Sequence, residues 1–390
     1  MRLVRENRPP IQLSYGGNVH PAETLDQLAH TLQTTTARVR QRLAADSLGV
    51  GLHLHEPLVR ELESPDASAL LRQVLAHEQL FVVTANVFPQ RAFHAPRVKE
   101  RVYAPDWSAP ERADYTLAAA AALARIAAPG SEPLTLSTLP LGHHALLRAK
   151  PGFRAAAAAQ LARVAQGLVQ LSSTAGRLIQ LAIEPEPACI LETQADLADW
   201  FVRELVPAAA ALGLDGATLR KHIGSCFDCC HAAVMHESTS SALQSLSSAG
   251  IAILKVQISA ALETDLPHGL AALTHCAEER WLHQTSVRCG HAMFVAEDLE
   301  RLPHGARGLA RTHFHIPIHA EPALPLRSTA EGLPRTLRML SALPCTHYEV
   351  ETYSFGVLPA HLAGMSLEES LAAELSTARR WLLEPDAPNP

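Results

Sequence analysis

Short apolar or β-branched runs alternate along the chain with longer runs rich in Ala, Leu, Arg, Gln and Glu. The short runs have the length and composition of β-strands, and several long runs begin at Thr, Asp or Ser and end at Gly or Pro, as capped helices do. The predicted strands are residues 11–17, 50–55, 80–88, 134–140, 178–186, 223–229, 252–259, 312–319 and 348–354. The predicted helices are residues 22–44, 66–78, 154–171, 194–213, 239–250 and 329–343.

This alternation of strands and helices indicates βαβ units and a parallel sheet. With this many units, a closed (β/α)8 TIM barrel is the most economical architecture. Nine predicted strands exceed the eight that a barrel uses, so we expect one of them to be a loop excursion or a wrong prediction. We expect residues 1–380 to form a single TIM-barrel domain and residues 381–390 to form a disordered tail.

Several predicted strands carry one apolar and one polar face, because side chains alternate between faces along a strand. The polar positions are His53 and His55, then Lys255, Gln257 and Ser259, then His313, His315 and His319, and finally Glu349 and Glu351. A parallel sheet covered by helices usually shows continuous apolar runs instead. In a barrel, these polar faces would point inward near the C-terminal mouth, where barrel enzymes hold their active sites. The alternative is an antiparallel sheet with one wet face, which the long intervening helices disfavour.

The charge balance and the cysteines limit the partners and the compartment. The 390 residues include 33 Lys and Arg against 39 Asp and Glu, a formal net charge of -6 without a dense basic block, which argues against nucleic acid as a partner. Seven cysteines, three of them in "CFDCC", do not suggest a disulfide framework, and the charged start "MRLVRENRPP" is not a secretory signal. We therefore expect a cytoplasmic protein. The 21 histidines raise the expectation of a metal site.

The segment "CFDCCH" ends a predicted strand with Asp228 and opens a helix with His231. Asp228 would be the last inward-facing strand residue and His231 would turn back toward it, so both could meet one divalent ion or one substrate hydroxyl. Carboxylate and imidazole together suit Zn, Mn or Fe. Two alternatives stay open. His231 could be a helix residue without a ligand role, or Cys226 and Cys229 could form a structural zinc site, although the chain offers no second pair at finger spacing.

Glu184 and Glu186 follow the apolar run "LIQLAI" on one strand face, each before a proline. Two buried carboxylates repel each other and raise one pKa unless a cation or a donor intervenes. A metal would resolve this conflict, with Glu184 at the strand end as the primary ligand and Glu186 orienting a neighbour or contacting substrate. Glu349 and Glu351 in "YEVETYS" repeat the arrangement at the last strand. The alternative is two exposed carboxylates at the rim.

Taken together, these strand ends resemble those of the xylose isomerase-like barrel superfamily, which holds sugar isomerases, sugar epimerases and endonuclease IV-type AP endonucleases. Its members place a metal on a Glu, an Asp followed three residues later by a His, another His, and a final Glu. The matching positions here are Glu184, Asp228, His231, Gln257 and Glu351. Gln257 departs from the usual His and is a weaker ligand, so His313 and His315 are candidates to replace it.

The segments "LSYGGNVHPAETLDQL", "STLPLG", "AIEPEPACILET", "FDCCHAAV", "KVQISAAL", "WLHQT", "THFHIPIH" and "YEVETYSFGVLP" are similar to the EboE-type proteins, over residues 11 to 359. These are called metabolite traffic proteins, or sugar phosphate isomerase/epimerase-like proteins, and are encoded in bacterial gene clusters. The resemblance implies that the chain handles a small sugar- or polyol-like metabolite, with membrane proteins of the same cluster as candidate partners. It places Asn18, His20, His283 and Gln284 near the barrel mouth, where a purely local loop role is the alternative for each.

In the superfamily, one divalent ion acts as a Lewis acid on adjacent substrate oxygens while two carboxylates move the proton. The resemblance implies that Glu184 and Glu351 are ligands and catalytic groups and that His231 binds a substrate hydroxyl. Lys255 would contact a substrate oxygen or neutralise the carboxylates. The metal would be Zn, Mn, Fe or Mg. Three function classes stay open: an isomerase or epimerase, a metal-assisted hydrolase of the AP endonuclease type, and a non-catalytic metabolite carrier or scaffold, which Gln257 favours.

Overall fold

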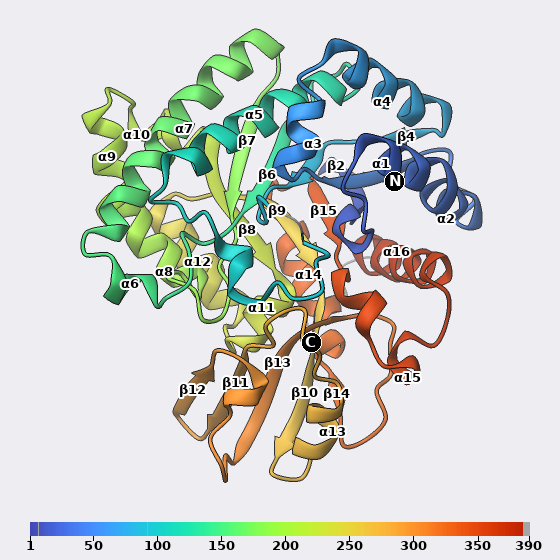
Figure 1. Cartoon of the computed structure of the whole chain (residues 1–390), viewed down its shortest axis with the longest axis vertical. Helices are drawn as coiled ribbons and strands as arrows, with labels where there is room; N and C mark the ends of the chain where they lie inside the picture. Colours follow the sequence, from blue (N-terminus) through green and yellow to red (C-terminus); the bar gives the residue numbers. More distant parts are fainter. Residues whose placement is uncertain (7, 92, 385–390) are drawn as a thin grey trace.

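Eight parallel strands close into a barrel in the computed structural model, which describes residues 1–6, 8–91 and 93–384 (Figure 1). The barrel strands are β2 (Arg8–Gly16), β3 (Leu48–His53), β5 (Thr84–Asn86), β6 (Leu134–Thr138), β7 (Ile179–Ile183), β8 (Ile223–Asp228), β9 (Ile253–Ile258) and β15 (His347–Val350). The ring closes because β2 pairs in parallel with both β3 and β15. Two short strands, β1 (Arg2–Arg5) and β4 (Leu80–Phe81), extend β2 and β3. The predicted (β/α)8 barrel is confirmed.

Helices surround the barrel and occupy the intervals between its strands (Figure 1). They are α1 (Leu25–Thr31), α2 (Ala37–Arg42), α3 (Glu56–Glu61), α4 (Pro65–His77), α5 (Pro110–Ile126), α6 (Leu146–Ala149), α7 (Phe153–Ala175), α8 (Gln194–Trp200), α9 (Val206–Ala211), α10 (Gly216–His222), α11 (Cys229–Val234), α12 (Thr239–Ala249), α14 (Leu333–Ser341), α15 (Ala360–Ala363) and α16 (Leu367–Leu383). A further helix, α13 (Leu270–His275), lies away from the barrel (Figure 1). The helix predicted over residues 22–44 is one run, in which the π-helical segment Leu32–Thr36 joins α1 to α2. None of the helices in the described ranges is long and apolar enough to cross a membrane.

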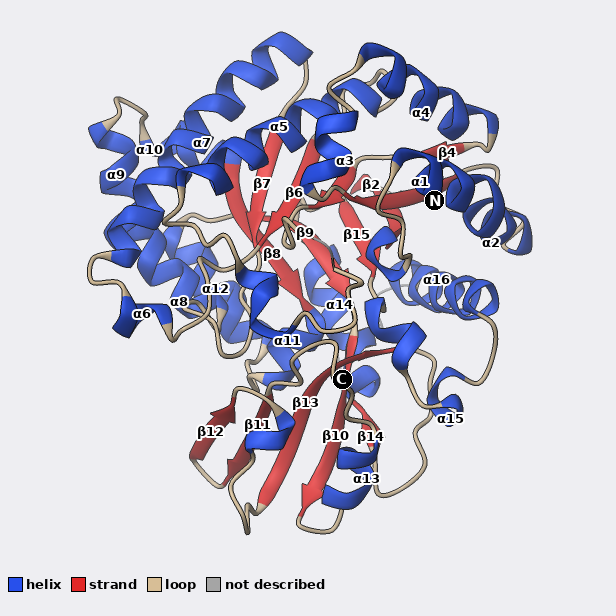
Figure 2. Ribbon diagram, viewed as in Figure 1, coloured by secondary structure: helices blue, strands red, loops and turns tan. Residues whose placement is uncertain are grey.

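A second sheet, which is antiparallel, is inserted between β9 and β15 and projects from one end of the barrel (Figure 2). Its strands are β10 (Ala260–Leu266), β11 (Thr285–Cys289), β12 (Ala292–Ala296), β13 (Gly308–Ile316) and β14 (Arg327–Ser328). We call it the inserted sheet. The ninth predicted strand, residues 312–319, is therefore neither a loop nor a wrong prediction, because it coincides with most of β13 and belongs to this sheet. The antiparallel alternative is correct for this part of the chain alone.

Only Ser259 separates β9 from β10, so the inserted sheet begins directly at the C-terminal end of a barrel strand. The division into one domain over residues 1–380 stays a prediction. Helix α16 continues to Leu383, into the expected tail, and residues 385–390 of that tail lie outside the described residues.

The register of the barrel brings several strand ends to one height. Asp228, at the end of β8, pairs with Gln257 of β9, and Gln257 pairs in turn with Glu349 of β15. Because parallel strands of a barrel end at the same rim, the residues that finish β7, β8 and β15 meet at the C-terminal mouth. The inserted sheet lies beyond this mouth.

Candidate metal centre at the barrel mouth

Three carboxylates from three strand ends converge at the mouth. Glu184 directly follows β7, Asp228 is the last residue of β8, and Glu351 directly follows β15. All three are buried, and each offers an oxygen within 4.8 Å of the others. The structure therefore brings together the three acidic residues that the sequence nominates as metal ligands.

Four buried atoms of this cluster have no hydrogen-bond partner within residues 1–6, 8–91 and 93–384: Glu184 Oε2, Asp228 Oδ2, Glu351 Oε2 and His315 Nε2. We call these the open atoms. His315 belongs to the cluster because one of its ring nitrogens lies within 4.8 Å of an Asp228 oxygen. An unpaired buried polar group costs on the order of 1–3 kcal/mol. Carboxylate oxygens and an imidazole nitrogen are ligands that divalent metals take, so the open atoms fit a bound cation.

In Asp228, Glu351 and His315, the other polar atom of the side chain is held by a hydrogen bond that fixes its orientation. Asp228 Oδ1 accepts from the backbone N–H of His231 at 2.7 Å, which makes it the N-cap of α11. Glu351 Oε1 accepts from the amide of Asn18 at 2.6 Å. His315 Nδ1 lies 3.1 Å from the carbonyl of Glu351 and must donate to it, so Nε2 carries a lone pair. Such a partner behind a histidine is typical of metal ligands.

Burial and mutual repulsion shift the pKa values of these groups toward their neutral forms. Burial first, then Glu351 and Asp228, raises the pKa of Glu184 well above its ordinary value. Burial first, then Asp228, raises the pKa of Glu351 to about 8, although Lys255 acts in the opposite direction. Burial lowers the pKa of His315 to about 4. A divalent cation would favour the ionised carboxylates and the neutral imidazole.

His231 and His313 face each other beside the carboxylates, with their Nε2 atoms 3.1 Å apart. His231 Nδ1 lies 3.0 Å from the carbonyl of Pro185, and His313 Nδ1 lies 2.7 Å from the amide oxygen of Gln284. Both partners only accept, so both rings donate through Nδ1 and their Nε2 lone pairs point at each other. This arrangement requires a shared proton or a cation. Glu186 offers an oxygen within 4.8 Å of both rings.

Glu186 is held by donors, in contrast to Glu184. The hydroxyl of Tyr103 donates to Oε1 at 2.9 Å, and the amide of Gln284 donates to the same oxygen at 3.0 Å. The assignment of Glu184 as the ligand and Glu186 as an orienting or substrate-contacting group stays a prediction, and this difference in hydrogen bonding supports it.

Lys255 does not contact the mouth as predicted for a substrate-binding residue. It is fully buried within the barrel, where Nζ lies 2.6 Å from Glu349 Oε1 and 3.2 Å from the hydroxyl of Ser137. Burial lowers the pKa of Lys255, but Glu349, Cys226 and Glu351 together raise it by more, and the net shift is upward. The structure thus places Lys255 in the alternative role, which is to neutralise a carboxylate.

Two other predicted substrate contacts point away from the cavity. His20 Nε2 lies 3.0 Å from the hydroxyl of Tyr15, which in turn contacts Thr36, so this ring is part of the packing outside the barrel. His283 stacks on Phe314 with ring centroids 3.9 Å apart and lies 3.1 Å from Glu278. The next residue, Gln284, faces the mouth instead, because neighbouring side chains of extended backbone point to opposite sides.

A cavity of about 60 Å³ opens above the carboxylates, several times the roughly 10–15 Å³ that one water requires. Its polar floor includes Glu184, Glu351 and His315. The cavity also has an aromatic wall, formed by Phe88, Phe93, Tyr103, Trp281 and Tyr353. These aromatic residues lie in loops and in the short 3-10 helices Lys99–Tyr103 and Tyr353–Val357, and none of them is nominated as a site residue from the sequence. Asn86, which lies 3.5 Å from Glu351, has a weak signal as a polar residue inside an apolar run.

No protein-family model and no curated protein matches this chain. Several solved structures do. A xylose isomerase-like TIM barrel protein from Mycobacterium smegmatis, in complex with magnesium, matches over 95% of this chain and 96% of its own, at 12% identity and a TM-score of 0.50. The fold is the xylose isomerase-like TIM barrel. At this identity the likeness shows the fold and not the reaction.

Two further structures are similar over comparable lengths. A D-tagatose 3-epimerase-like protein covers 95% of this chain and 97% of its own at 12% identity, with a TM-score of 0.49. A sugar phosphate isomerase/epimerase from Parabacteroides distasonis covers 96% of both chains at 9% identity, with a TM-score of 0.44.

In this xylose isomerase-like barrel, Gln257 takes the position that the sequence resemblance assigns to a histidine ligand. Its amide oxygen accepts from the thiol of Cys226 at 3.1 Å, and its Nε2 has no partner among the residues that the structure describes. Its amide oxygen would be free for a metal only after a half-turn of the amide. His315 presents its Nε2 in the same cluster from the inserted sheet. The pair Cys226 and Cys229 does not form one of the ligand groups found in the described ranges.

Proposed function

We propose that this chain is a metal-dependent isomerase or epimerase that acts on a small sugar- or polyol-like metabolite at the barrel mouth. The observation that carries the proposal is the set of four open atoms, which are buried, unpaired and drawn from three barrel strand ends and the inserted sheet. If these residues served only for packing, their unpaired buried atoms would together destabilise the folded protein by several kcal/mol.

Glu184, Asp228, Glu351 and His315 would hold the ion, and Gln257 and His313 stand next to them as further candidates. Three carboxylates and one imidazole admit Mn, Fe, Zn or Mg. Magnesium is the ion in the Mycobacterium smegmatis structure, and the acidic set here is compatible with it. When bound, a divalent ion supplies Lewis-acid polarisation of a substrate oxygen.

The chain's own residues would perform the rest of the reaction. Glu184 and Glu351 reach the cavity from different strands and would remove a proton from a substrate carbon and return one. His231 and Glu186, with Asn18 opposite, would hold substrate hydroxyls. The aromatic wall would exclude water from the reacting carbon.

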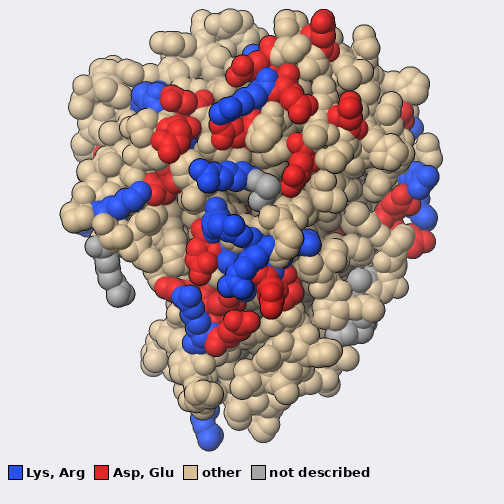
Figure 3. Space-filling view, in the orientation of Figure 1, with Lys and Arg blue, Asp and Glu red and all other residues tan. Residues whose placement is uncertain are grey.

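The motifs shared with EboE-type proteins narrow the proposal further. They support a bacterial metabolite traffic role in the cytoplasm, with a sugar- or polyol-like substrate and membrane-protein partners from the same gene cluster. No nucleic-acid partner is proposed. On the face in Figure 3, Lys and Arg side chains are interspersed with Asp and Glu side chains, whereas a nucleic-acid backbone is bound by clustered cations.

A second candidate function is metal-assisted hydrolysis, as in the AP endonuclease-like enzymes. The observation that favours it is the pair His231 and His313, whose Nε2 lone pairs face each other within reach of Glu186. A further ion there would give the multinuclear, His-rich centre that such hydrolases use. The substrate would then be a small phosphoester rather than a nucleic acid.

Metal content and isotope exchange test these proposals together. After chelation, we expect the protein to bind Mn²⁺ or Mg²⁺ stoichiometrically and to incorporate solvent deuterium at a substrate carbon within a panel of ketoses, aldoses and their phosphates. Asp228→Asn should lose both properties, whereas His77→Ala, at an exposed histidine of α4, should keep both. Release of phosphate from phosphoesters without deuterium exchange would favour the hydrolase. Absence of stoichiometric metal in the wild type would overturn both enzyme proposals and leave the carrier or scaffold.

A further inference from the structure

A second ligand cluster lies outside the barrel mouth and shares no residue with it. His143 and His144 lie in the loop that follows β6, and Glu297 directly follows β12 of the inserted sheet. One ligand atom from each lies within 4.8 Å of the other two. The two rings have centroids 4.7 Å apart, and His144 Nε2 lies 2.6 Å from Glu297 Oε1. We call this group the junction cluster.

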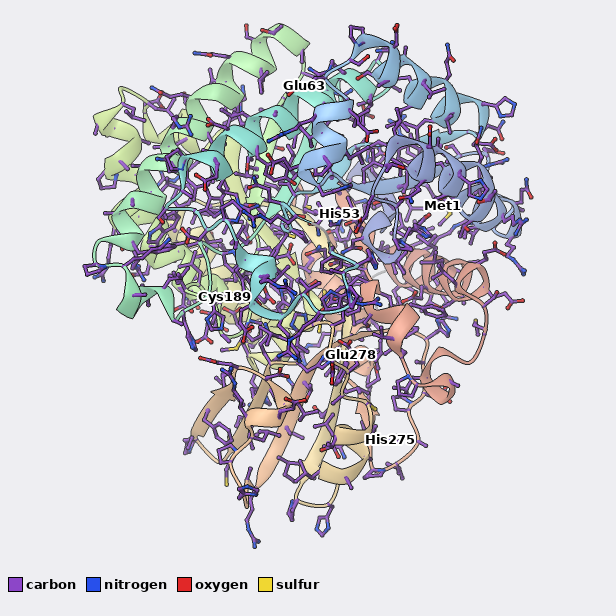
Figure 4. The ribbon with its side chains drawn as sticks, viewed as in Figure 1. Met1, His53, Glu63, Cys189, His275 and Glu278 are labelled. Atoms are coloured by element: carbon purple, nitrogen blue, oxygen red, sulfur yellow. The ribbon has the colours of Figure 1, made fainter. Side chains whose placement is uncertain are left out.

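The backbone on both sides of the junction cluster is fixed. His143 forms a β-bridge with Cys189, which Figure 4 labels near the level where the barrel meets the inserted sheet. The backbone N–H of His144 donates to Ala188 at 3.1 Å. On the other side, Asp298 follows Glu297 and accepts from Lys99 at 2.7 Å. The three side chains are therefore presented by anchored segments rather than by free loops.

One side chain of the cluster carries a buried polar atom that the protein does not satisfy. His143 is only 7% exposed, and its Nε2 has no hydrogen-bond partner in the described part of the chain. Its other nitrogen, Nδ1, accepts only a long hydrogen bond of 3.3 Å from the backbone N–H of Ala145, so the lone pair of the neutral ring lies on Nδ1 and its proton on Nε2. A metal would take the Nδ1 lone pair in place of this weak bond, or bind Nε2 after the proton has left it. Burial, followed by His144, lowers the pKa of His143, so the ring is neutral and able to act as a ligand.

The charges around the cluster favour a cation. Glu297 also binds Arg301, which in turn lies 3.6 Å from Glu100, so the nearby arginine is itself compensated. Burial raises the pKa of Glu192, and His144 lies close enough to this carboxyl to act in the opposite direction. The acidic groups near the two imidazoles thus outnumber the one arginine.

We propose that the junction cluster is a second metal site, selective for zinc-class transition ions, that links the β6 loop to the inserted sheet. Two imidazoles and one carboxylate are a ligand set that Zn²⁺ takes with a water in the fourth position. Imidazole ligands suit Zn²⁺ and disfavour Mg²⁺, whereas the acidic mouth accepts Mg²⁺ or Mn²⁺. Behind His143 lies Tyr103, with ring centroids 5.6 Å apart, and Tyr103 donates to Glu186. The bound ion would therefore brace the wall of the cavity.

This inference does not rest on the proposed function, and the test keeps the two apart. The full-length protein is stripped with a chelator and titrated with Zn²⁺ in the Asp228→Asn background, with Mg²⁺ in excess. We expect one equivalent of Zn²⁺ in Asp228→Asn. Adding His144→Ala should weaken this binding by at least roughly tenfold, since even indirect partners of a metal change affinity by that much. Glu297→Gln, which keeps side-chain shape at a half-exposed position, should do the same.

The matched control is His77→Ala, because His77 forms an exposed histidine–carboxylate pair with Glu78 at 2.9 Å and lies in α4. It should leave zinc binding unchanged. Equal zinc binding with and without His144→Ala and Glu297→Gln would overturn the inference, as would the absence of zinc from Asp228→Asn. Either result would mean that His144 and Glu297 pair with each other and do not bind a metal. The comparison of wild type with Asp228→Asn, in contrast, reports on the mouth alone.

Discussion

Buried carboxylates occur in two layers of the barrel interior, and they differ in whether the protein itself supplies a cationic partner. Glu349 and Glu351 lie two residues apart at the end of β15 and face the same side. In the lower layer, Glu349 is paired with Lys255 at 2.6 Å. In the upper layer, Glu351 meets Glu184 and Asp228 and keeps one of the open atoms.

The lower layer is shaped around its own ion pair. A Cβ at Gly51 would lie 1.5 Å from Glu349 Oε2, so glycine leaves the room that the carboxylate occupies. Above it, no lysine of the described residues pairs with the carboxylates of the upper layer. The protein thus supplies the counter-charge in the lower layer and leaves it to a ligand in the upper one. Pairing, rather than residue type, separates a structural carboxylate from a functional one.

The largest effect is expected when the lower layer loses its cation. Lys255→Met leaves Glu349 charged and unpaired in the barrel, which costs roughly 3–5 kcal/mol for a buried pair broken from one side. Urea denaturation should show a fall of this size in the free energy of unfolding. The double variant Lys255→Met with Glu349→Gln should recover most of it. A double variant as unstable as the single one would assign the loss to packing instead.

Neutralising a carboxylate in the upper layer should not lower the free energy of unfolding of the metal-free protein. Glu351→Gln keeps an acceptor for Asn18 and cannot take the charge that burial and Asp228 already oppose in the metal-free protein, so this form should be at least as stable as the wild type. The stabilisation by metal, about 3 kcal/mol at a hundredfold excess over Kd, should disappear. Thermal unfolding with and without Mn²⁺ measures both. A metal-free variant clearly less stable than the wild type would place Glu351 with the structural carboxylates.

The sequence predicts the upper layer well because its three carboxylates finish regular strands. Alternation along β7, β8 and β15 predicts which side chains point inward, and parallel strands end at one rim. The sequence does not predict at which height within the barrel an inward-pointing side chain lies. Lys255 and Gln257 share a face of β9, yet the first is paired below and the second lies beside Asp228. Only the stagger between strands decides this, and it is set by the whole ring.

The inserted sheet and the loops could not be predicted for a different reason. Of its strands, only β13 has a strong alternating pattern, and the others are short or partly exposed. The sequence therefore offers His313 and His315 as candidates without showing that they reach the mouth from outside the barrel. His20 and His283 do not line the cavity, and their roles stay predictions. Each lies in irregular backbone, where no period indicates which way a side chain points.

A third kind of buried carboxylate, Glu374, extends the comparison. It has an oxygen without a hydrogen-bond partner but belongs to no group of acidic residues that could hold a metal, among the described residues. Glu374 of α16 accepts from Thr352 at 2.7 Å and from the N–H of Ile318 at 3.0 Å, and burial raises its pKa to about 7. The folded state therefore keeps a proton that the unfolded chain releases from pH 4.5 upward, so stability falls as the pH rises to 7 and the penalty is complete above it.

Glu374→Gln mimics the protonated form and should remove this penalty. At pH 8 the variant should be more stable than the wild type by roughly 3 kcal/mol, and at pH 4 the two should be nearly equal. Urea denaturation at several pH values measures the difference. A gap that does not change with pH would mean that the pKa of Glu374 is the same in the folded and unfolded states. Metal should leave the gap unchanged because the residue is not part of the mouth.

The smallest effect is expected at Gln257, and it decides which side chain completes the upper layer. Gln257→Met removes an amide whose oxygen meets only the thiol of Cys226, so the stability should change by less than about 1 kcal/mol. If His315 supplies the imidazole, metal affinity measured by calorimetry should stay within about tenfold of the wild type, whereas His315→Gln should exceed that loss. The opposite ranking would show that the amide turns to bind the ion and that the ligand set is drawn from the barrel alone, with the inserted sheet left to cover the substrate.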